Sequence, residues 1–240
     1  MNNFEKPGTY WDQTLTINKD AALQKFMNDT YAKMGMGVAF SGIIAFFVSN
    51  TPALAEMIIG SGITLLLFLA LLGLSFVAPK IIMSKSISAA NAVFWIYSGI
   101  WGIILAPYLL MYTQTEVATA FLSASIAFAG MSLWGYTTKN DLSPIGRIMG
   151  MLVIGLIAAM LLNFFIFQSG GMSFIISLIV VAAFSLLAAY ETQNLKNMYL
   201  QMKGQDDAVE RMGILGALSM YSTFVTLFIH ILNIIGLSRD

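Results

Sequence analysis

Five polar side chains recur at helical spacing in an otherwise apolar stretch near the end of the chain. They are Ser219, Thr223, Thr226, His230 and Asn233, separated by four, three, four and three positions. At ~100° per residue they fall within about 80° of arc, so a helix would carry them as one polar stripe. Inside a membrane such a stripe either hydrogen-bonds to neighbouring helices or lines the path of an ion or a proton. We expect it to face the interior of a helical bundle.

A single carboxylate, Glu191, directly follows another apolar run, and we expect it to face protein at the membrane boundary. One interpretation is an interfacial residue that is ion-paired with Lys196 or Arg211. The other is a titratable gate or a cation ligand, since polar groups in hydrocarbon are costly and mark functional sites. Glu191 is therefore the one candidate metal ligand that the sequence offers.

Residue counts exclude several other chemistries. His230 is the only histidine, so a zinc site built from two histidines on one helix cannot form. The chain has no cysteine, which excludes disulfides and thiolate catalysis. The last apolar run has no lysine for a retinal Schiff base, and no glycine-rich phosphate loop is present. We expect no enzymatic activity, no cofactor and, at zero net charge, no nucleic-acid partner.

Membrane-spanning helices must position these residues. The chain is 58% hydrophobic and 10% charged, whereas soluble domains carry about 25% charged residues, so lipid has to solvate most of its surface. Seven apolar runs approach the ~20 residues of a bilayer crossing, which predicts an all-α membrane protein with seven transmembrane helices. The runs are Met34–Ser49, Met57–Ala78, Ala89–Tyr112, Val117–Tyr136, Ile148–Phe167, Met172–Tyr190 and Met212–Leu237.

The basic residues predict how these helices are oriented. Eleven of the twelve Lys and Arg residues lie before the first run or in the second-to-third, fourth-to-fifth and sixth-to-seventh connections, and only Arg239 lies on the other side. Because Lys and Arg concentrate in cytoplasmic loops, we predict a multi-pass protein of the cytoplasmic membrane. Its N-terminus would be cytoplasmic and its C-terminus outside, with the lipid bilayer as its main partner.

The sequence divides into a cytoplasmic segment, residues 1–33, and a transmembrane domain, residues 34–237. Apolar residues recur at helical spacing toward the end of the first segment, which predicts an amphipathic helix at the membrane interface. These residues are Leu23, Phe26, Met27, Tyr31 and Met34.

Four stretches carry a family resemblance: Leu23–Met27, Gly135–Ser143, Tyr190–Gln193 and Gly216–Tyr221. With them the chain resembles the bacterial branch of the Bax inhibitor-1 family, also called transmembrane Bax inhibitor motif proteins. The residues that carry the second and third motifs are Thr137, Thr138, Asp141, Tyr190 and Gln193.

The resemblance implies six helices around a central seventh and a pH-sensitive calcium leak between two facing aspartates. Here the first acidic position is Glu191 and the second is Thr223. One carboxylate lacks the coupling by which a close pair shares a proton, so we expect weak or altered conduction, with calcium as the transported ion. The alternative is a non-conducting regulator, linked to stress response, that binds a membrane protein such as a membrane-anchored quality-control protease.

Overall fold

The computed structural model describes the backbone of residues 10–60, 62–202 and 204–239, and within these ranges the side chains from residue 21 onward. These residues are helical, with short connections and no strand. Seven of the helices are long and apolar enough to cross a membrane, as predicted. The elements are α1 (Tyr10–Ser49), α2 (Pro52–Gly60), α3 (Ile63–Ser84), α4 (Ile87–Met111), α5 (Gln114–Thr137), α6 (Ser143–Leu162), the π-helical turn η1 (Asn163–Phe167), α7 (Gly170–Gln201) and α8 (Asp206–Leu237).

Local sequence explains where several helices begin. Ser86 and Ser169 cap the first turns of α4 and α7, and Thr113 forms a reciprocal capping box with Glu116 at the start of α5. Gly62 adopts a left-handed conformation, with φ of 70°, between α2 and α3. Because of this break, the second membrane helix begins at Ile63, later than the predicted start, and α2 is a separate short helix.

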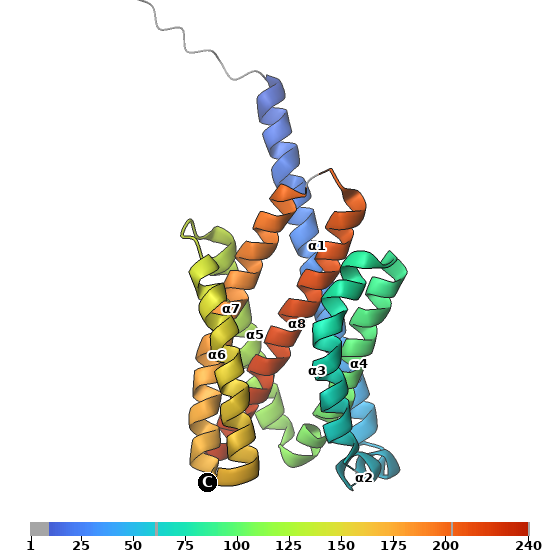
Figure 1. Cartoon of the computed structure of the whole chain (residues 1–240), viewed down its shortest axis with the longest axis vertical. Helices are drawn as coiled ribbons and strands as arrows, with labels where there is room; N and C mark the ends of the chain where they lie inside the picture. Colours follow the sequence, from blue (N-terminus) through green and yellow to red (C-terminus); the bar gives the residue numbers. More distant parts are fainter. Residues whose placement is uncertain (1–9, 61, 203, 240) are drawn as a thin grey trace, which may run out of the picture.

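Helix α8 runs through the bundle and packs against α1, α3, α4, α5 and α7, and its apolar stretch is the most buried of the seven (Figure 1). Its fully buried side chains include Met220, Tyr221, Leu227 and Leu232. Helix α6 packs mainly against α7, at the periphery, and the arrangement of six helices around one stays a prediction. The beginning of α1 and the C-terminus lie at opposite ends of the bundle, which requires an odd number of crossings.

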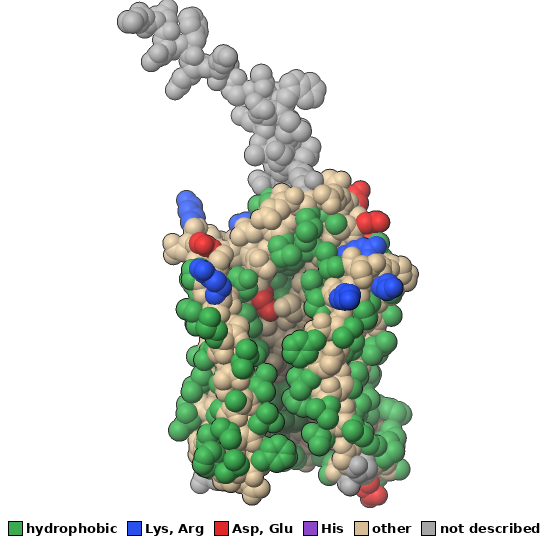
Figure 2. Space-filling model, viewed as in Figure 1, with side chains coloured by type: hydrophobic (Ala, Val, Ile, Leu, Met, Phe, Trp, Pro, Cys, Tyr) green, Lys and Arg blue, Asp and Glu red, His purple; other side chains and the backbone are tan. Residues whose placement is uncertain are grey.

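The surface that faces outward along the bundle is apolar. Large side chains such as Phe76, Met151 and Ile126 are among the most exposed residues of the protein. Figure 2 shows hydrophobic side chains covering the length of the helices, with Lys and Arg gathered at the end where α1 begins. This distribution suits a surface solvated by lipid along its sides and by water at its ends.

Helix α1 is continuous through Lys33, where the sequence suggested a boundary between two regions. The apolar residues before that point are turned toward the protein: Phe26 stacks on Tyr199 of α7 with ring centroids 4.7 Å apart, and Leu23 and Met27 are buried in the same core. They pack against the bundle, and a position of this part of α1 at the membrane interface stays a prediction. Residues 1–9 of the predicted cytoplasmic segment lie outside the described part of the chain.

Candidate functional site

The Glu191 carboxyl group lies on α7 and faces α8. The Ser219 hydroxyl of α8 donates a hydrogen bond to its Oε1, with an O–O distance of 2.5 Å. Its other oxygen, Oε2, is buried and has no hydrogen-bond partner among the described residues. A buried carboxylate oxygen without a donor is costly, so this group is poised to take a proton, a water molecule or a cation.

A cavity of about 250 Å³ borders this carboxyl group, and we call it the Glu191 cavity. It lies between Pro79 of α3, Asn194 and Met198 of α7, and Ser219 of α8. Figure 2 shows a hollow between α3 and α7 on this face, with an acidic side chain inside it. Within the described residues Glu191 forms no ion pair, and the predicted partner Lys196 instead donates to the Tyr136 carbonyl at 2.9 Å.

Thr223, the second position that the sequence singled out, is 2% exposed and lies beside the Glu191 carboxyl. The structure therefore brings together the two positions that the sequence singled out, with one carboxylate and one hydroxyl. No group of three or more His, Cys, Asp or Glu side chains that could hold a metal occurs among the residues described. A calcium ion prefers six to eight oxygen ligands, and Glu191 as a metal ligand stays a prediction.

The five residues of the polar stripe on α8 do not share one environment. Ser219 is exposed and contacts Glu191, whereas Thr223 is buried. Thr226 is half-buried and donates to the carbonyl of Ser222 in its own helix, at 2.8 Å. The stripe is therefore not a uniform wall around a central path.

The far end of the stripe forms a small polar cluster with α7. The Ser177 hydroxyl is fully buried and lies 3.0 Å from Nδ1 of His230, and it accepts a hydrogen bond from the Asn233 amide at 2.9 Å. Ser177 was missed by the sequence interpretation because a single serine in an apolar run carries no periodic signal. This cluster fits the interpretation of polar residues that join neighbouring membrane helices.

A second set of hydroxyls, also missed, joins α8 to α1, α3 and α4. Ser222 donates to the Tyr97 hydroxyl at 3.0 Å, and Tyr97 lies 3.2 Å from the Ser75 hydroxyl of α3. The buried Tyr221 hydroxyl lies 2.5 Å from that of Ser41 on α1. These contacts fix α8 against three other helices along the middle of the bundle.

The motif residues of α7 and of the connection between α5 and α6 meet in space. The Gln193 side chain accepts from the Leu142 N–H and donates to the Asn140 carbonyl, both at 2.8 Å. Within this connection the Asp141 carboxylate accepts from the Ser143 N–H at 2.9 Å. Hydrogen bonds from the Ser143 hydroxyl and N–H hold the pKa of Asp141 below its ordinary value. Gln193 thus binds the connection between α5 and α6 to α7.

The remaining motif residues also have structural contacts. Thr137 donates to the Leu133 carbonyl at 2.8 Å, and the Thr138 hydroxyl accepts from the Asn140 N–H at 3.2 Å. The Tyr190 ring lies against Gly146 of α6, where a Cβ would come within 2.3 Å of the ring. The second and third motifs therefore hold α5, α6 and α7 together, and of their residues Glu191 alone lines the Glu191 cavity.

Replacing Gln193 with alanine should loosen the connection between α5 and α6. The N–H of the buried Leu142 and the carbonyl of the exposed Asn140 lose their hydrogen bonds, at a cost of about 1–3 kcal/mol. Local opening would then let a protease bind the backbone around Lys139, whose side chain already lies on the surface of this connection. We expect trypsin to cleave after Lys139 roughly tenfold faster than in the unmodified protein, measured by mass spectrometry of timed digests in detergent.

The matched control is Gln201→Ala, which removes an exposed glutamine from the last turn of the same helix. Its cleavage rate after Lys139 should equal that of the unmodified protein. Equal rates for the Gln193 and Gln201 variants would contradict the structural role assigned to Gln193.

Comparison with known proteins identifies the family of the chain. The family model described as Inhibitor of apoptosis-promoting Bax1 matches residues 23–240. The chain is 34% identical to the inner membrane protein YbhL of Escherichia coli over 225 residues, which cover 93% of this chain and 96% of that protein. It is 37% identical to an uncharacterized protein of Deinococcus radiodurans over 218 residues, 91% of this chain and 92% of the relative. An uncharacterized membrane protein of Streptococcus pyogenes is 34% identical over 232 residues, 94% of this chain and 98% of the relative. On the length and identity of these matches, the chain is a member of the Bax inhibitor-1 family.

Proposed function

We propose that this protein conducts cations through a bacterial cytoplasmic membrane, with the Glu191 cavity as the ion site at one end of the path. The observation that supports this proposal is the buried Oε2 oxygen of Glu191, which has no partner among the described residues and borders a cavity. An unpaired ionisable group at membrane depth is costly and is retained where ions or protons move.

The proposed orientation follows from the ends of the bundle. Lys and Arg side chains gather at the end where α1 begins (Figure 2), and Glu191 lies toward this end, in the last third of α7. Under the positive-inside rule this end is cytoplasmic and the C-terminus is outside. The Glu191 cavity would then open toward the cytoplasm.

The chemistry of the site favours a weak, poorly selective cation site. Glu191 supplies one negative charge, and neutral oxygens come from Ser219, Thr223 and Asn194. Hard cations bind such oxygens, but tight calcium sites carry more ligands and more charge. Weak binding is compatible with a leak, because a conducted ion has to leave its site as readily as it enters.

Replacing Glu191 with glutamine should lower cation flux to the level of empty liposomes. Glutamine keeps nearly the same shape and can still accept from Ser219, but it removes the negative charge that offsets the desolvation of a cation. The measurement is calcium and proton flux into liposomes that contain the purified protein, followed with dyes enclosed in the vesicles. The control is Asp207→Asn, which removes a carboxylate from the exposed first turn of α8 at the same end of the bundle.

The Asp207 variant should conduct as the unmodified protein does. Flux that is equal in the Glu191 and Asp207 variants, or no flux above empty liposomes for any of the three proteins, would overturn the proposal.

A second candidate function is regulation of another membrane protein. It is favoured by α1, which extends beyond the other helices at the proposed cytoplasmic end (Figure 1) and would offer a contact surface in water. In that role the segment 1–33 and the connection between α7 and α8 would contact a partner such as a membrane-anchored quality-control protease. Glu191 would then be dispensable, so the flux assay discriminates between the two functions.

A further inference from the structure

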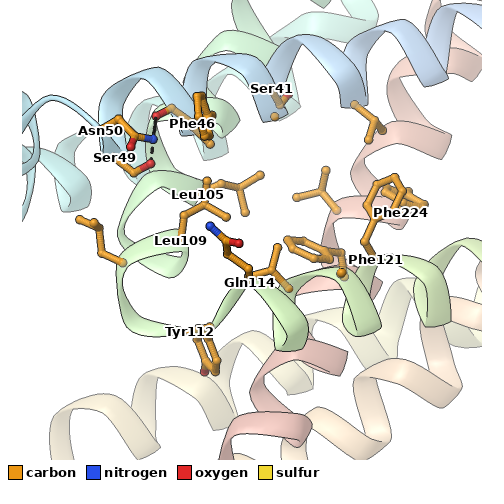
Figure 3. Close-up of a pocket in the computed structure, with 18 residues that line it drawn as sticks. Ser41, Phe46, Ser49, Asn50, Leu105, Leu109, Tyr112, Gln114, Phe121 and Phe224 are labelled. Carbon is orange, nitrogen blue, oxygen red and sulfur yellow. Dashed lines mark hydrogen bonds between the residues drawn. The ribbon is translucent and has the colours of Figure 1, made fainter.

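A larger cavity lies on another side of the bundle, away from Glu191. It has a volume of about 570 Å³ and lies between α1, α4, α5 and α8 (Figure 3), and we call it the lateral cavity. Helices α1 and α5 both pack against α8 but do not pack closely against each other, so a gap remains between them. The volume falls within the ~300–1,000 Å³ that is typical of small-molecule sites.

The wall of the lateral cavity is uncharged, since no Lys, Arg, Asp or Glu lines it. Aliphatic and aromatic side chains make up its inner part, and Figure 3 shows several of them pointing into the space. The inner hydroxyl, that of Ser41, is already bonded to the Gly37 and Ser98 carbonyls and to Tyr221. Residues that form the inner wall include Ala45, Leu105, Phe224, Val225 and Phe228.

The lateral cavity opens sideways, toward the lipid. Phe46 of α1 is 64% exposed, and Leu110 of α4 and Phe121 of α5 are also exposed on the same rim. Side chains of this kind at the surface of a membrane helix contact acyl chains. The mouth is therefore bordered by hydrocarbon over much of its length.

Apart from Ser41, the polar groups of the lateral cavity lie at one end of it. Asn50 follows the last residue of α1, Tyr112 follows α4 and Gln114 begins α5, so all three lie at the membrane boundary. In Figure 3 the Gln114 amide points into the cavity. An apolar interior with amide and phenol groups at the boundary has the same polarity profile as a phospholipid, whose ester and headgroup region lies at that depth.

We propose that the lateral cavity binds one acyl chain of a membrane phospholipid, with the headgroup held at the end formed by Asn50, Tyr112 and Gln114. The uncharged lining favours a phospholipid as the source of the chain. A free fatty acid would place its carboxylate directly on the chain, among uncharged groups, whereas a phospholipid places a neutral ester there and its phosphate further out. In the orientation proposed above this lipid belongs to the outer leaflet. The inference depends on the membrane position of the bundle and is independent of ion conduction.

Photo-crosslinking tests this site directly. The full-length protein is reconstituted in vesicles that contain a phosphatidylethanolamine with a diazirine halfway along one acyl chain, and crosslinked residues are mapped by mass spectrometry after illumination. We expect crosslinks at Ala45 and Val225, which are buried from bulk lipid but line the lateral cavity. Phe76, which faces outward from α3, reports the labelling by bulk lipid.

Two glycines of α1 give a matched pair of variants. Gly42 lines the lateral cavity, and a Cβ there would meet open space, so Gly42→Leu fills part of the cavity without a clash. Gly35 also has open space around it but lies outside the cavity. Crosslinking at Ala45 and Val225, relative to Phe76, should fall roughly tenfold in Gly42→Leu, because leucine displaces several methylene groups of the bound chain. Gly35→Leu should leave it unchanged.

Three outcomes would overturn the proposal. Crosslinks confined to outward-facing residues such as Phe76 would mean that the lateral cavity holds no lipid. An undiminished yield in Gly42→Leu would place the bound chain elsewhere. Equal labelling at Ala45 and Val225 by a diazirine fatty acid at the same concentration would show that the headgroup end does not select a phospholipid. The first and third outcomes are read on the unmodified protein, so they do not depend on how the variant folds.

Discussion

Replacing Gly135 with alanine is expected to destabilise the protein by about 3 kcal/mol, one of the two largest effects that we predict. Gly135 lies on α5, and a Cβ at this position would come within 2.1 Å of the carbonyl oxygen of Ala189 on α7. The obstacle is backbone, so no side chain can rotate away and the two helices have to separate. Loss of about 3 kcal/mol should lower the unfolding midpoint in detergent by roughly 6–12 °C.

Gly130→Ala is the matched control, because Gly130 also lies within α5 but a Cβ there meets nothing within 4 Å. Alanine is favoured over glycine in a helix by about 1 kcal/mol, so this variant should unfold at the same temperature or slightly higher. Thermal unfolding of both variants can be followed by circular dichroism. Similar midpoints for the two would contradict the close packing of α5 against α7.

Replacing Phe94 with alanine is expected to have an effect of similar size, about 3 kcal/mol. Phe94 on α4 is fully buried. Its ring packs edge to face against that of Tyr221, with 6.2 Å between the ring centroids, and it fills the space beside Gly37 on α1. In a bilayer little hydrophobic free energy is gained by moving a side chain from lipid into protein, so packing supplies most of the stabilisation. Alanine would leave a cavity between three helices and forfeit those contacts.

The control is Phe76→Ala on α3, since Phe76 is 85% exposed on the outer surface. Lipid chains can fill the space that this phenylalanine leaves, and we expect a change within about 0.5 kcal/mol. The two variants remove the same atoms, so a comparison of their unfolding midpoints isolates the effect of burial. Equal losses of stability would mean that Phe94 is not packed as the structure has it.

The seven spans could be predicted from sequence because the signal is local. A helix that crosses lipid satisfies its own backbone hydrogen bonds and needs about 20 apolar residues. Consecutive residues of the chain meet both requirements, so the signal can be detected in a short stretch of sequence. The start of the second span was predicted too early because Met57 and Ile58 are as apolar as the helix that follows. The helix break at Gly62 depends on one backbone conformation, which mean hydropathy does not register.

The candidate site stays a prediction, but the sequence singled out residues that the fold brings together. Glu191 was singled out because a carboxylate next to an apolar run is unusual, and Thr223 through a family motif. What covers the polar stripe of α8 could not be predicted, because periodicity places residues on one face without saying what packs against that face. In the structure Ser177 of α7 covers the end near His230, whereas Ser219 remains exposed.

The amino-acid sequence by itself determined that this is a seven-span membrane protein of the Bax inhibitor-1 family with one carboxylate at its candidate site. These properties follow from composition, local apolar length and short motifs. Only the tertiary structure decided that Gln193 joins α7 to the connection between α5 and α6, that one oxygen of Glu191 lacks a partner among the described residues, and that a gap separates α1 from α5. Each of these depends on contacts between helices far apart in the chain, and in lipid such contacts are selected by side-chain shape and hydrogen bonding, which hydropathy does not encode.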